Sequence, residues 1–284
     1  MKLIIILLLL YFTTSCIKNN TDPSWIYIDN WSIESNKTNT EGILSHNFTD
    51  AYILVDNKII GYFELPIKIP LLMNGTKKIE IFPVIHDNGI AATKKIYPFC
   101  ESYVITTNLI QNKTININPK TRYLSTTNFW IEDFEDAGIK INTYSNFPNI
   151  LGTGDSIPIL KYGSRYGVIK LNKKDSSWLG YTNSQLSLPK SGTEIYLEMD
   201  YMNSNSLLTG VIAYDFSGSK FNPNILLNSQ LMNNIKWKKI YISLKEIVSY
   251  SVNANYFEQY FKADLENGKN NSIIYLDNIK LVYF

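Results

Sequence analysis

Apolar and polar residues alternate along most of this chain, in short runs that end at turn-forming residues. Trp25–Ile28 is such a run, and Ala51–Val55 and Lys58–Phe63 flank the pair Asp56-Asn57. A period of two with β-branched residues predicts half-buried strands, and the Asp-Asn pair predicts a hairpin turn. The same reasoning predicts a turn at Asn74-Gly75, between strand-like runs. The further predicted strands of the first half are 71–73, 77–82, 92–99, 103–107 and 114–118.

Residues 119–128 are polar and rich in turn formers, and a second series of strand-like runs follows them. No long helical period occurs in either series, and one short helix is expected, at 254–260 or at 244–249. We therefore predict an all-β fold with two antiparallel β-sandwich domains. The predicted organisation is a first domain at 24–119, a linker at 120–127 and a second domain at 128–284. The predicted strands of the second domain are 167–171, 194–201, 209–216, 237–244 and 273–284.

The first sixteen residues have the pattern of an export signal. Lys2 precedes the apolar run Leu3–Leu10, which is too short to span a bilayer stably, and small residues lead to Cys16. The segment resembles the lipobox of bacterial lipoproteins, although Thr13 stands where that pattern usually has Leu. The resemblance implies cleavage before Cys16, acylation of this cysteine and a membrane anchor joined to the fold by a tether at 17–23. The alternative is an ordinary cleaved signal peptide.

Composition excludes several classes of function. A hydrophobic fraction of 45% can build large cores, and a net charge of +2 with interspersed signs predicts no nucleic-acid partner. Two cysteines exclude a cysteine-based metal site, and Cys100 is expected to be a small buried residue. His46 and His86 lack the spacing of a metal motif. Since no nucleophile elbow, phosphate loop or dinucleotide fingerprint occurs either, we expect a protein that is not an enzyme.

Part of the first domain resembles known envelope modules. The segment Val55–Gly61, followed by Leu65-Pro66 and Gly75–Ile81, resembles the PEGA type of small β-sandwich. The longer stretch 25–99 resembles the N-terminal domain of lipoproteins from Bacteroidota. These resemblances imply a lipid-anchored protein of the outer membrane, on the cell surface or on the periplasmic face, and imply no reaction.

The second domain has three landmarks, at Trp130–Asp136, Trp237–Leu244 and Ile274–Leu281. The opening Phe-Glu-Asp, the Trp-Lys-Lys strand and the closing Leu-Asp-Asn-Ile resemble the jelly-roll domains of carbohydrate-binding modules and galactose-binding-like folds. The resemblance covers most of 128–284 and implies the fold more strongly than a function, because one sandwich architecture serves many tasks.

Jelly rolls of this kind often hold a structural calcium ion that joins the first and last strands. The resemblance places Glu135 and Asp277 at that site, with Asp136 as a further oxygen ligand. Calcium takes six to eight hard oxygens, so carboxylates from strands distant in sequence suit it. The alternative is that Asp277 and Asn278 lie in a solvated turn.

A sugar-binding face would need exposed aromatic rings, on which a pyranose stacks, beside amide groups that bind its hydroxyls. Trp178 and Tyr181 lie in a turn-rich stretch, close to Asn183 and Gln185, and are the predicted glycan-binding residues. Aromatic residues on strands more often belong to the core, and Trp237 is expected there. Tyr201 and Tyr214 are further candidates of the same kind.

These observations lead to a non-enzymatic outer-membrane lipoprotein whose jelly roll recruits a glycan or a partner protein. An accessory subunit of an outer-membrane secretion or assembly machine is the alternative, in which both domains contact an envelope protein complex. A glycoside hydrolase is a remote third reading, based on the carboxylates at 132–136. Asp155-Ser156-Ile157 resembles the short O-glycosylation motif of exported Bacteroidota proteins, which makes Ser156 a glycosylation candidate.

Overall fold

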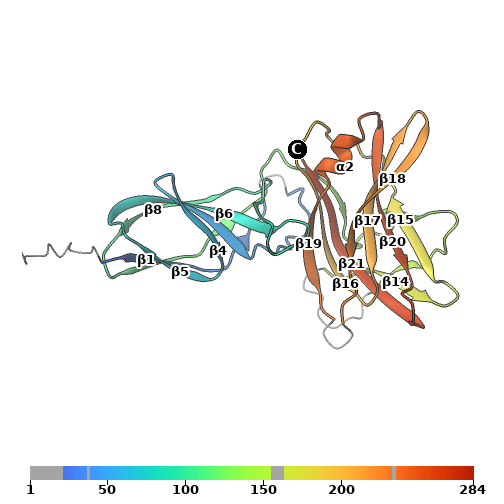
Figure 1. Ribbon diagram of the computed structural model, residues 1–284, viewed down its shortest axis with the longest axis horizontal. Coiled ribbons are helices and arrows are strands. Elements are labelled where there is room, and N and C mark those ends of the chain that lie inside the picture. The colour runs from blue at the N-terminus through green and yellow to red at the C-terminus, as the bar shows by residue number, and fades with distance from the viewer. Residues whose placement is uncertain (1–21, 37–38, 155–162, 232–234) are drawn as a thin grey trace, which may run out of the picture.

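The computed structural model describes residues 22–36, 39–154, 163–231 and 235–284. Within these ranges the chain is nearly all β, with one short helix, α2 (Lys245–Tyr250). Two groups of sheets follow each other along the long axis of the molecule (Figure 1). The all-β prediction is confirmed, and α2 corresponds to the second of the two expected helix positions. No helix in the described part of the chain is long and apolar enough to cross a membrane.

The first domain is a β-sandwich. Its strands are β1 (Ser24–Ile28), β2 (Ser32–Ile33), β3 (Asp50–Val55), β4 (Lys58–Glu64), β5 (Ile67–Leu71), β6 (Gly75–His86), β7 (Lys94–Ile96), β8 (Tyr103–Leu109), β9 (Thr114–Ile117) and β10 (Lys120–Thr121). One sheet has the order β5-β1-β9, and the facing sheet has the order β4-β3-β6-β7 with β8 also paired to β6. The small sheet β10-β2 extends the sandwich. Pairing is antiparallel except between β1 and β9 and between β2 and β10.

Local sequence explains the first hairpin. Ala51, Ile53 and Val55 are fully buried on one side of β3, as the alternation predicts. Asp56 and Asn57 have φ angles of 47° and 63°, the left-handed conformation that a two-residue type I′ turn requires. Asp and Asn tolerate this conformation better than other non-glycine residues, and the predicted hairpin is confirmed.

The turn predicted at Asn74-Gly75 does not make a hairpin. β5 pairs with β1 in one sheet, whereas β6 pairs with β3 and β8 in the other. Gly75 turns with a φ of +78°, but the chain crosses between the sheets at this point. The physical reason is burial: both β5 and β6 carry apolar residues that face one core, and they meet across it rather than along a shared edge.

The second domain is a jelly roll of two antiparallel sheets, one with six strands and one with five. Its strands are β11 (Asn128–Glu132), β12 (Ile141–Thr143), β13 (Leu151–Gly154), β14 (Tyr166–Asn172), β15 (Ser177–Thr182), β16 (Ile195–Asn203), β17 (Leu207–Asp215), β18 (Gly218–Leu227), β19 (Lys238–Ser243), β20 (Tyr256–Asp264) and β21 (Asn271–Tyr283). The proximal sheet, next to the first domain, has the order β13-β14-β21-β16-β19 with β11 paired to β21. The distal sheet has the order β12-β15-β20-β17-β18 (Figure 1).

The core of the jelly roll lies between these two sheets. Trp178 and Phe261 come from the distal sheet, and Leu197 and Leu276 come from the proximal sheet; all four are buried. The Trp178 ring lies against the backbone of Gly180, where an added Cβ would approach a ring carbon to 2.2 Å. β18 begins at Gly218 and forms one edge of the distal sheet.

The two domains share a buried junction. Tyr196, Tyr241 and Val282 of the proximal sheet belong to the same buried cluster as Tyr97 and Phe99 of the first domain. The backbone N–H of Asn47 donates a hydrogen bond to the Tyr241 hydroxyl at 2.9 Å. Part of the predicted linker is ordered by pairing, since β10 lies within it. Cys100 is a buried free thiol, as expected, and burial raises its pKa.

A buried ionic network lies within this junction. The carboxylate of Glu198, fully buried on β16, pairs with Lys239 at 3.1 Å and accepts hydrogen bonds from the hydroxyls of Tyr97 and Tyr123. Lys280 donates to the carbonyls of residues 41 and 43 at 2.5 and 2.6 Å. Burial opposes ionisation of Glu198, but Lys239 and Lys280 outweigh it and lower the pKa of Glu198. The junction is therefore specified by charge as well as by apolar packing.

Candidate functional site

The distal sheet has a second, outward-facing apolar cluster. Leu179, Ile212 and Tyr260 are 6%, 0% and 3% exposed, and they alternate along their strands with residues of the main core. Partly exposed side chains pack against them from outside: Tyr144, Phe147, Tyr181, Leu208 and Tyr214. We call this surface the distal face. Its outer rings are partly exposed. The sheet that carries this face lies on the side of the jelly roll opposite the first domain (Figure 1).

Edge-to-face contacts link four rings of the distal face. Tyr144 lies 5.9 Å from Tyr181 and 5.9 Å from Phe221, and Phe221 lies 5.2 Å from Tyr260, measured between ring centroids. Gly210 makes room for this packing, because a Cβ at this position would come within 2.5 Å of the Tyr260 ring. The rings thus hold one another in fixed orientations, as a preformed binding surface requires.

A stacked pair lies beside them. The rings of Tyr214 and Tyr256 are 4.5 Å apart and nearly parallel, and the Tyr214 hydroxyl donates to a Glu258 carboxylate oxygen at 2.7 Å. Burial raises the pKa of Glu258, while the hydrogen bond from Tyr214 opposes that rise. Burial and the hydrogen bond to Glu258 both raise the pKa of Tyr214. The distal face therefore combines aromatic rings with a hydroxyl and a carboxyl group.

The structure separates the two predicted glycan-binding aromatics. Trp178 is 0% exposed and its indole N–H donates to the Thr143 hydroxyl at 3.3 Å, so the prediction that it forms an exposed platform is wrong. Tyr181 lies on the distal face. The reason is strand geometry: residues three apart on one strand point to opposite faces, so Trp178 and Tyr181 cannot share a surface.

The predicted amide groups lie beyond the end of β15. Asn183 and Gln185 are both exposed. The Asn183 backbone amide donates to the Lys140 carbonyl at 2.8 Å, and its side-chain oxygen accepts a hydrogen bond from Ser184. Of the further aromatic candidates, Tyr214 joins Tyr181 on the distal face, whereas Tyr201 and Trp237 line a hollow at the domain junction.

Carboxylates converge around Asp277, but the described residues do not form a complete set of metal ligands. Asp277 is 3% exposed, and burial together with the charges of Asp200, Glu135 and Asp133 raises its pKa to about 8. Such a site favours a proton or a cation. Among the described residues, however, no group of three or more His, Cys, Asp or Glu side chains has a metal-binding arrangement.

The other predicted calcium ligands have partners of their own. Glu135 accepts hydrogen bonds from the hydroxyl of Ser164 and from the backbone amides of Ser164 and Arg165, the latter two at 2.6 and 2.8 Å. Burial opposes ionisation, but these hydrogen bonds outweigh it and lower the pKa of Glu135. Asp136 is 61% exposed and pairs with Lys140 at 2.8 Å. The carboxylate oxygens of Asp277 and Glu135 are ligands of the kind that calcium prefers, whereas the carboxylate of Asp136 pairs with a lysine.

The first carboxylate of the cluster at 132–136 has a structural role. Glu132 is fully buried and accepts hydrogen bonds from the backbone amides of Phe134 and Lys140. These contacts hold the turn after β11. Two other predicted sites, the lipidation site Cys16 and the glycosylation site Ser156, lie outside the described residues.

Comparisons with known proteins find no matching family model and no matching curated protein. Solved structures with partial likeness include a carbohydrate-binding module described as a member of the β-sandwich superfamily, at 13% identity and a TM-score of 0.41, covering 92% of this chain and 98% of that one. A second is a Caldicellulosiruptor saccharolyticus family 27 carbohydrate-binding module in complex with mannohexaose, at 11% identity and a TM-score of 0.36, covering 54% of this chain and 96% of that one.

A third is the enzymatically active domain of tailspike protein 4 from bacteriophage CBA120, at 13% identity and a TM-score of 0.33. That match covers 55% of this chain and only 19% of the tailspike chain. At these identities and TM-scores the likenesses assign neither a ligand nor a reaction to this chain.

Proposed function

We propose that this chain is a non-enzymatic binding protein that holds a glycan on the distal face of its jelly roll. The observation that carries the proposal is the outward aromatic cluster around Leu179, Ile212 and Tyr260. Contiguous outward groups of apolar and aromatic side chains, here including Tyr181 and Tyr214, are typical of surfaces that bind a ligand or a partner. Sugar rings present apolar C–H faces to such side chains, and the Tyr214–Glu258 pair offers hydrogen bonds to hydroxyls.

The test is glycan binding by variants of the distal face. Tyr181→Ala removes a rim ring that is only partly buried, so the fold should survive while affinity falls. Tyr181→Phe keeps the ring and should retain most of the affinity, because stacking rather than the hydroxyl carries the contact. Tyr62→Ala, which removes a 46% exposed ring from the first domain, is the matched control. A broad glycan array followed by calorimetry would measure these effects.

Two results would contradict the proposal. One is a folded parent protein that binds no glycan on the array. The other is binding that Tyr181→Ala and Tyr214→Ala leave unchanged while the melting temperature shows that both variants are folded. In either case the distal aromatics would be explained by packing alone.

A second candidate function is favoured by a different surface. Phe216, Tyr250 and Val252 are 99%, 80% and 70% exposed, and Tyr250 and Val252 line a hollow of about 260 Å³ with Asp215. Exposed apolar side chains grouped at one end of a domain are typical of protein contacts. An accessory subunit of an envelope complex would use this end, and Phe216→Ser would then abolish co-purification with the complex without affecting glycan binding.

We further propose two features that bear on this function. Acylation of Cys16 would anchor the protein to the outer membrane, with the tether at 17–23 leading to β1. A calcium ion at Asp277 and Glu135 would neutralise the carboxylates there and join strands that are distant in sequence. When bound, it would supply stability rather than chemistry.

A further inference from the structure

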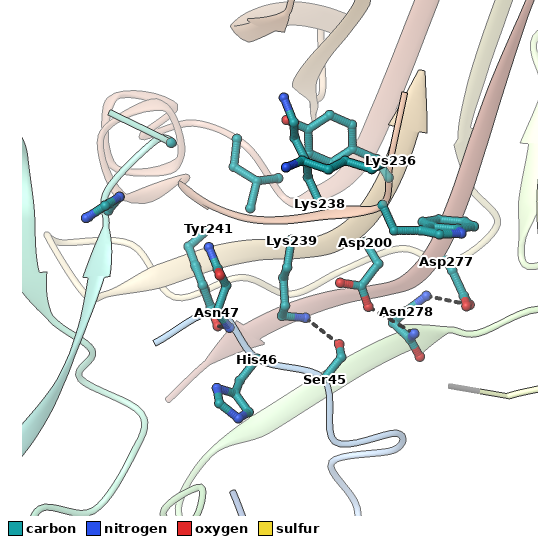
Figure 2. Close-up of a pocket in the computed structure, with 15 residues that line it drawn as sticks. Ser45, His46, Asn47, Asp200, Lys236, Lys238, Lys239, Tyr241, Asp277 and Asn278 are labelled. Carbon is teal, nitrogen blue, oxygen red and sulfur yellow. Dashed lines mark hydrogen bonds between the residues drawn. The ribbon is translucent and has the colours of Figure 1, made fainter. Parts of the chain in front are cut away.

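A hollow of about 530 Å³ lies at the junction of the two domains, away from the distal face. One wall is formed by residues 45–47 and His86 of the first domain. The other wall is formed by β16, by residues 236–241 at the start of β19, and by Asp277 and Asn278 of β21 (Figure 2). Hollows of roughly 300–1,000 Å³ at domain boundaries are favoured positions for ligand sites.

One end of the hollow is basic. Lys236 and Lys238 are exposed side chains on either side of Trp237, and neither forms an ion pair with a carboxylate among the described residues. Lys239 differs, because its ammonium group pairs with Glu198 and donates to the Ser45 hydroxyl at 2.9 Å. Two neighbouring ammonium groups without an ionic partner attract an anionic group.

The other end is acidic and polar. Asp200 accepts a hydrogen bond from the side-chain amide of Asn278 at 3.0 Å (Figure 2). Asn278 is 1% exposed, and its side-chain oxygen has no hydrogen-bond partner in the described structure. The indole N–H of Trp237 is likewise buried there without a partner. A simple anion would be repelled by Asp200, whereas hydroxyl groups can donate to its carboxylate.

We propose that this hollow binds an acidic saccharide, one that carries a carboxylate in the manner of a uronic acid. Lys238 and Lys239 point to opposite sides of β19, which is an edge strand of the proximal sheet, so the saccharide would cross this edge. Its carboxylate would lie at Lys236 and Lys238 on one side, and further sugar units would contact Trp237 and donate hydroxyls to Asp200 on the other. A neutral sugar leaves both lysines unused, and a small anion without hydroxyls has no contact for Asp200. The site uses none of the residues of the distal face, so the two sites can be tested separately.

The test is calorimetric titration of the full protein with trigalacturonate and with galactotriose, its neutral counterpart. Trigalacturonate should bind, galactotriose should bind at least tenfold more weakly, and affinity for the acid should fall as salt rises from about 50 to 500 mM. The double variant Lys236→Gln/Lys238→Gln should lose about tenfold in affinity for the acid. The double variant Lys173→Gln/Lys174→Gln, which removes the same charge from an exposed turn, should bind as the parent does.

Three outcomes would overturn the proposal. The first is no binding of trigalacturonate, and the second is equal binding of the acidic and neutral sugars. The third is loss of acid binding in Tyr181→Ala but not in the double variant of Lys236 and Lys238, which would place the ligand on the distal face. That third result would leave the proposed function standing while removing the junction site.

Discussion

Truncation of Glu198 should be among the most destabilising single changes in this chain. Glu198→Ala leaves the ammonium of Lys239, whose side chain is 4% exposed, without its carboxylate. It also removes the acceptor of the hydroxyls of Tyr97 and Tyr123, both nearly fully buried. Removing one partner of a buried ion pair typically costs about 3–5 kcal/mol, and a buried group left without a hydrogen bond costs about 1–3 kcal/mol. These costs overlap, so we expect a loss of about 4 kcal/mol.

Urea unfolding monitored by tryptophan fluorescence measures this loss, and the chain supplies a matched control. Glu194 also joins the domains, through Lys95 at 2.8 Å, and pairs with Lys245 of its own domain at 2.9 Å. Its side chain is 22% exposed, however, and those of the two lysines are 35% and 39% exposed. Pairs in such contact with water contribute roughly 0–1 kcal/mol. Glu194→Ala should therefore lower the free energy of unfolding by no more than about 1 kcal/mol.

A double-mutant cycle separates the ion pair from the rest of the network. Lys239→Met removes the buried cation, and in combination with Glu198→Ala it should be less destabilising than the sum of the single changes, by about 1–3 kcal/mol. If Glu198→Ala costs less than 1 kcal/mol, or if the two changes are additive, then the junction network does not stabilise the fold and the reasoning is wrong. Two separate unfolding transitions in Glu198→Ala, in place of one, would indicate that the domains have come apart.

The remaining predictions concern other parts of the chain. Trp178→Ala should cost about 3–5 kcal/mol of unfolding free energy, whereas Tyr250→Ala, at an 80% exposed position, should cost less than about 0.5 kcal/mol. Cys16→Ser should move the protein from the membrane to the soluble fraction, and unchanged retention after normal cleavage would contradict the anchor. Chelation should lower the melting temperature of the parent but not of Asp277→Ala; equal melting with and without calcium would exclude the ion. Because the folded pKa of Glu198 lies below that of an unfolded glutamate, its ionisation stabilises the fold above about pH 4.5 and this contribution is lost as the pH falls. Glu198→Gln should therefore lose less stability than the parent on acidification, and parallel pH profiles would contradict the assignment.

The alternation of apolar and polar residues was sufficient to predict the fold class, because a strand with one buried face has an apolar residue at every second position. The hairpin at Asp56-Asn57 could be predicted for the same reason, since both its strands and its turn are local. The path of the chain after Asn74-Gly75, from one sheet to the other, could not be predicted. Which strand becomes the partner of β5 depends on β1, more than forty residues earlier, and a turn signal carries no information about that choice.

The candidate site was predictable in part. Placing Trp178 and Tyr181 on opposite faces needed only their spacing of three residues, once β15 was recognised as a strand. The distal rings of Tyr144, Phe221 and Tyr256 could not be assembled from sequence. They come from the residue after β12, from β18 and from β20, and the order of these strands in the sheet is set by the jelly-roll topology.

The junction network was hidden for a different reason. Charged residues that alternate with apolar ones in a strand predict a solvent-exposed face of the sandwich. In the predicted strands this is the pattern at Glu198, Lys239 and Lys280. They are covered only because the first domain packs against that face. The sequence of the second domain does not indicate which of its faces another domain covers. The burial of these charges is therefore evident only in the structure of both domains.

The position of the first domain restricts which face of the jelly roll can bind the proposed glycan. A sandwich has two outward faces, and here the face of the proximal sheet is occupied by the first domain, which leaves the distal face as the free broad surface of the jelly roll. β1, the first described strand, lies at the opposite end of the molecule (Figure 1). If Cys16 is the point of attachment, a junction held by buried charges would keep the distal face directed away from the membrane, and a flexible linker would not. Glycan capture from intact cells should then be weaker in Glu198→Ala than in Glu194→Ala at equal surface level, while the affinities of the two purified proteins stay equal. Equal capture would show that the fixed orientation of the domains contributes nothing to binding.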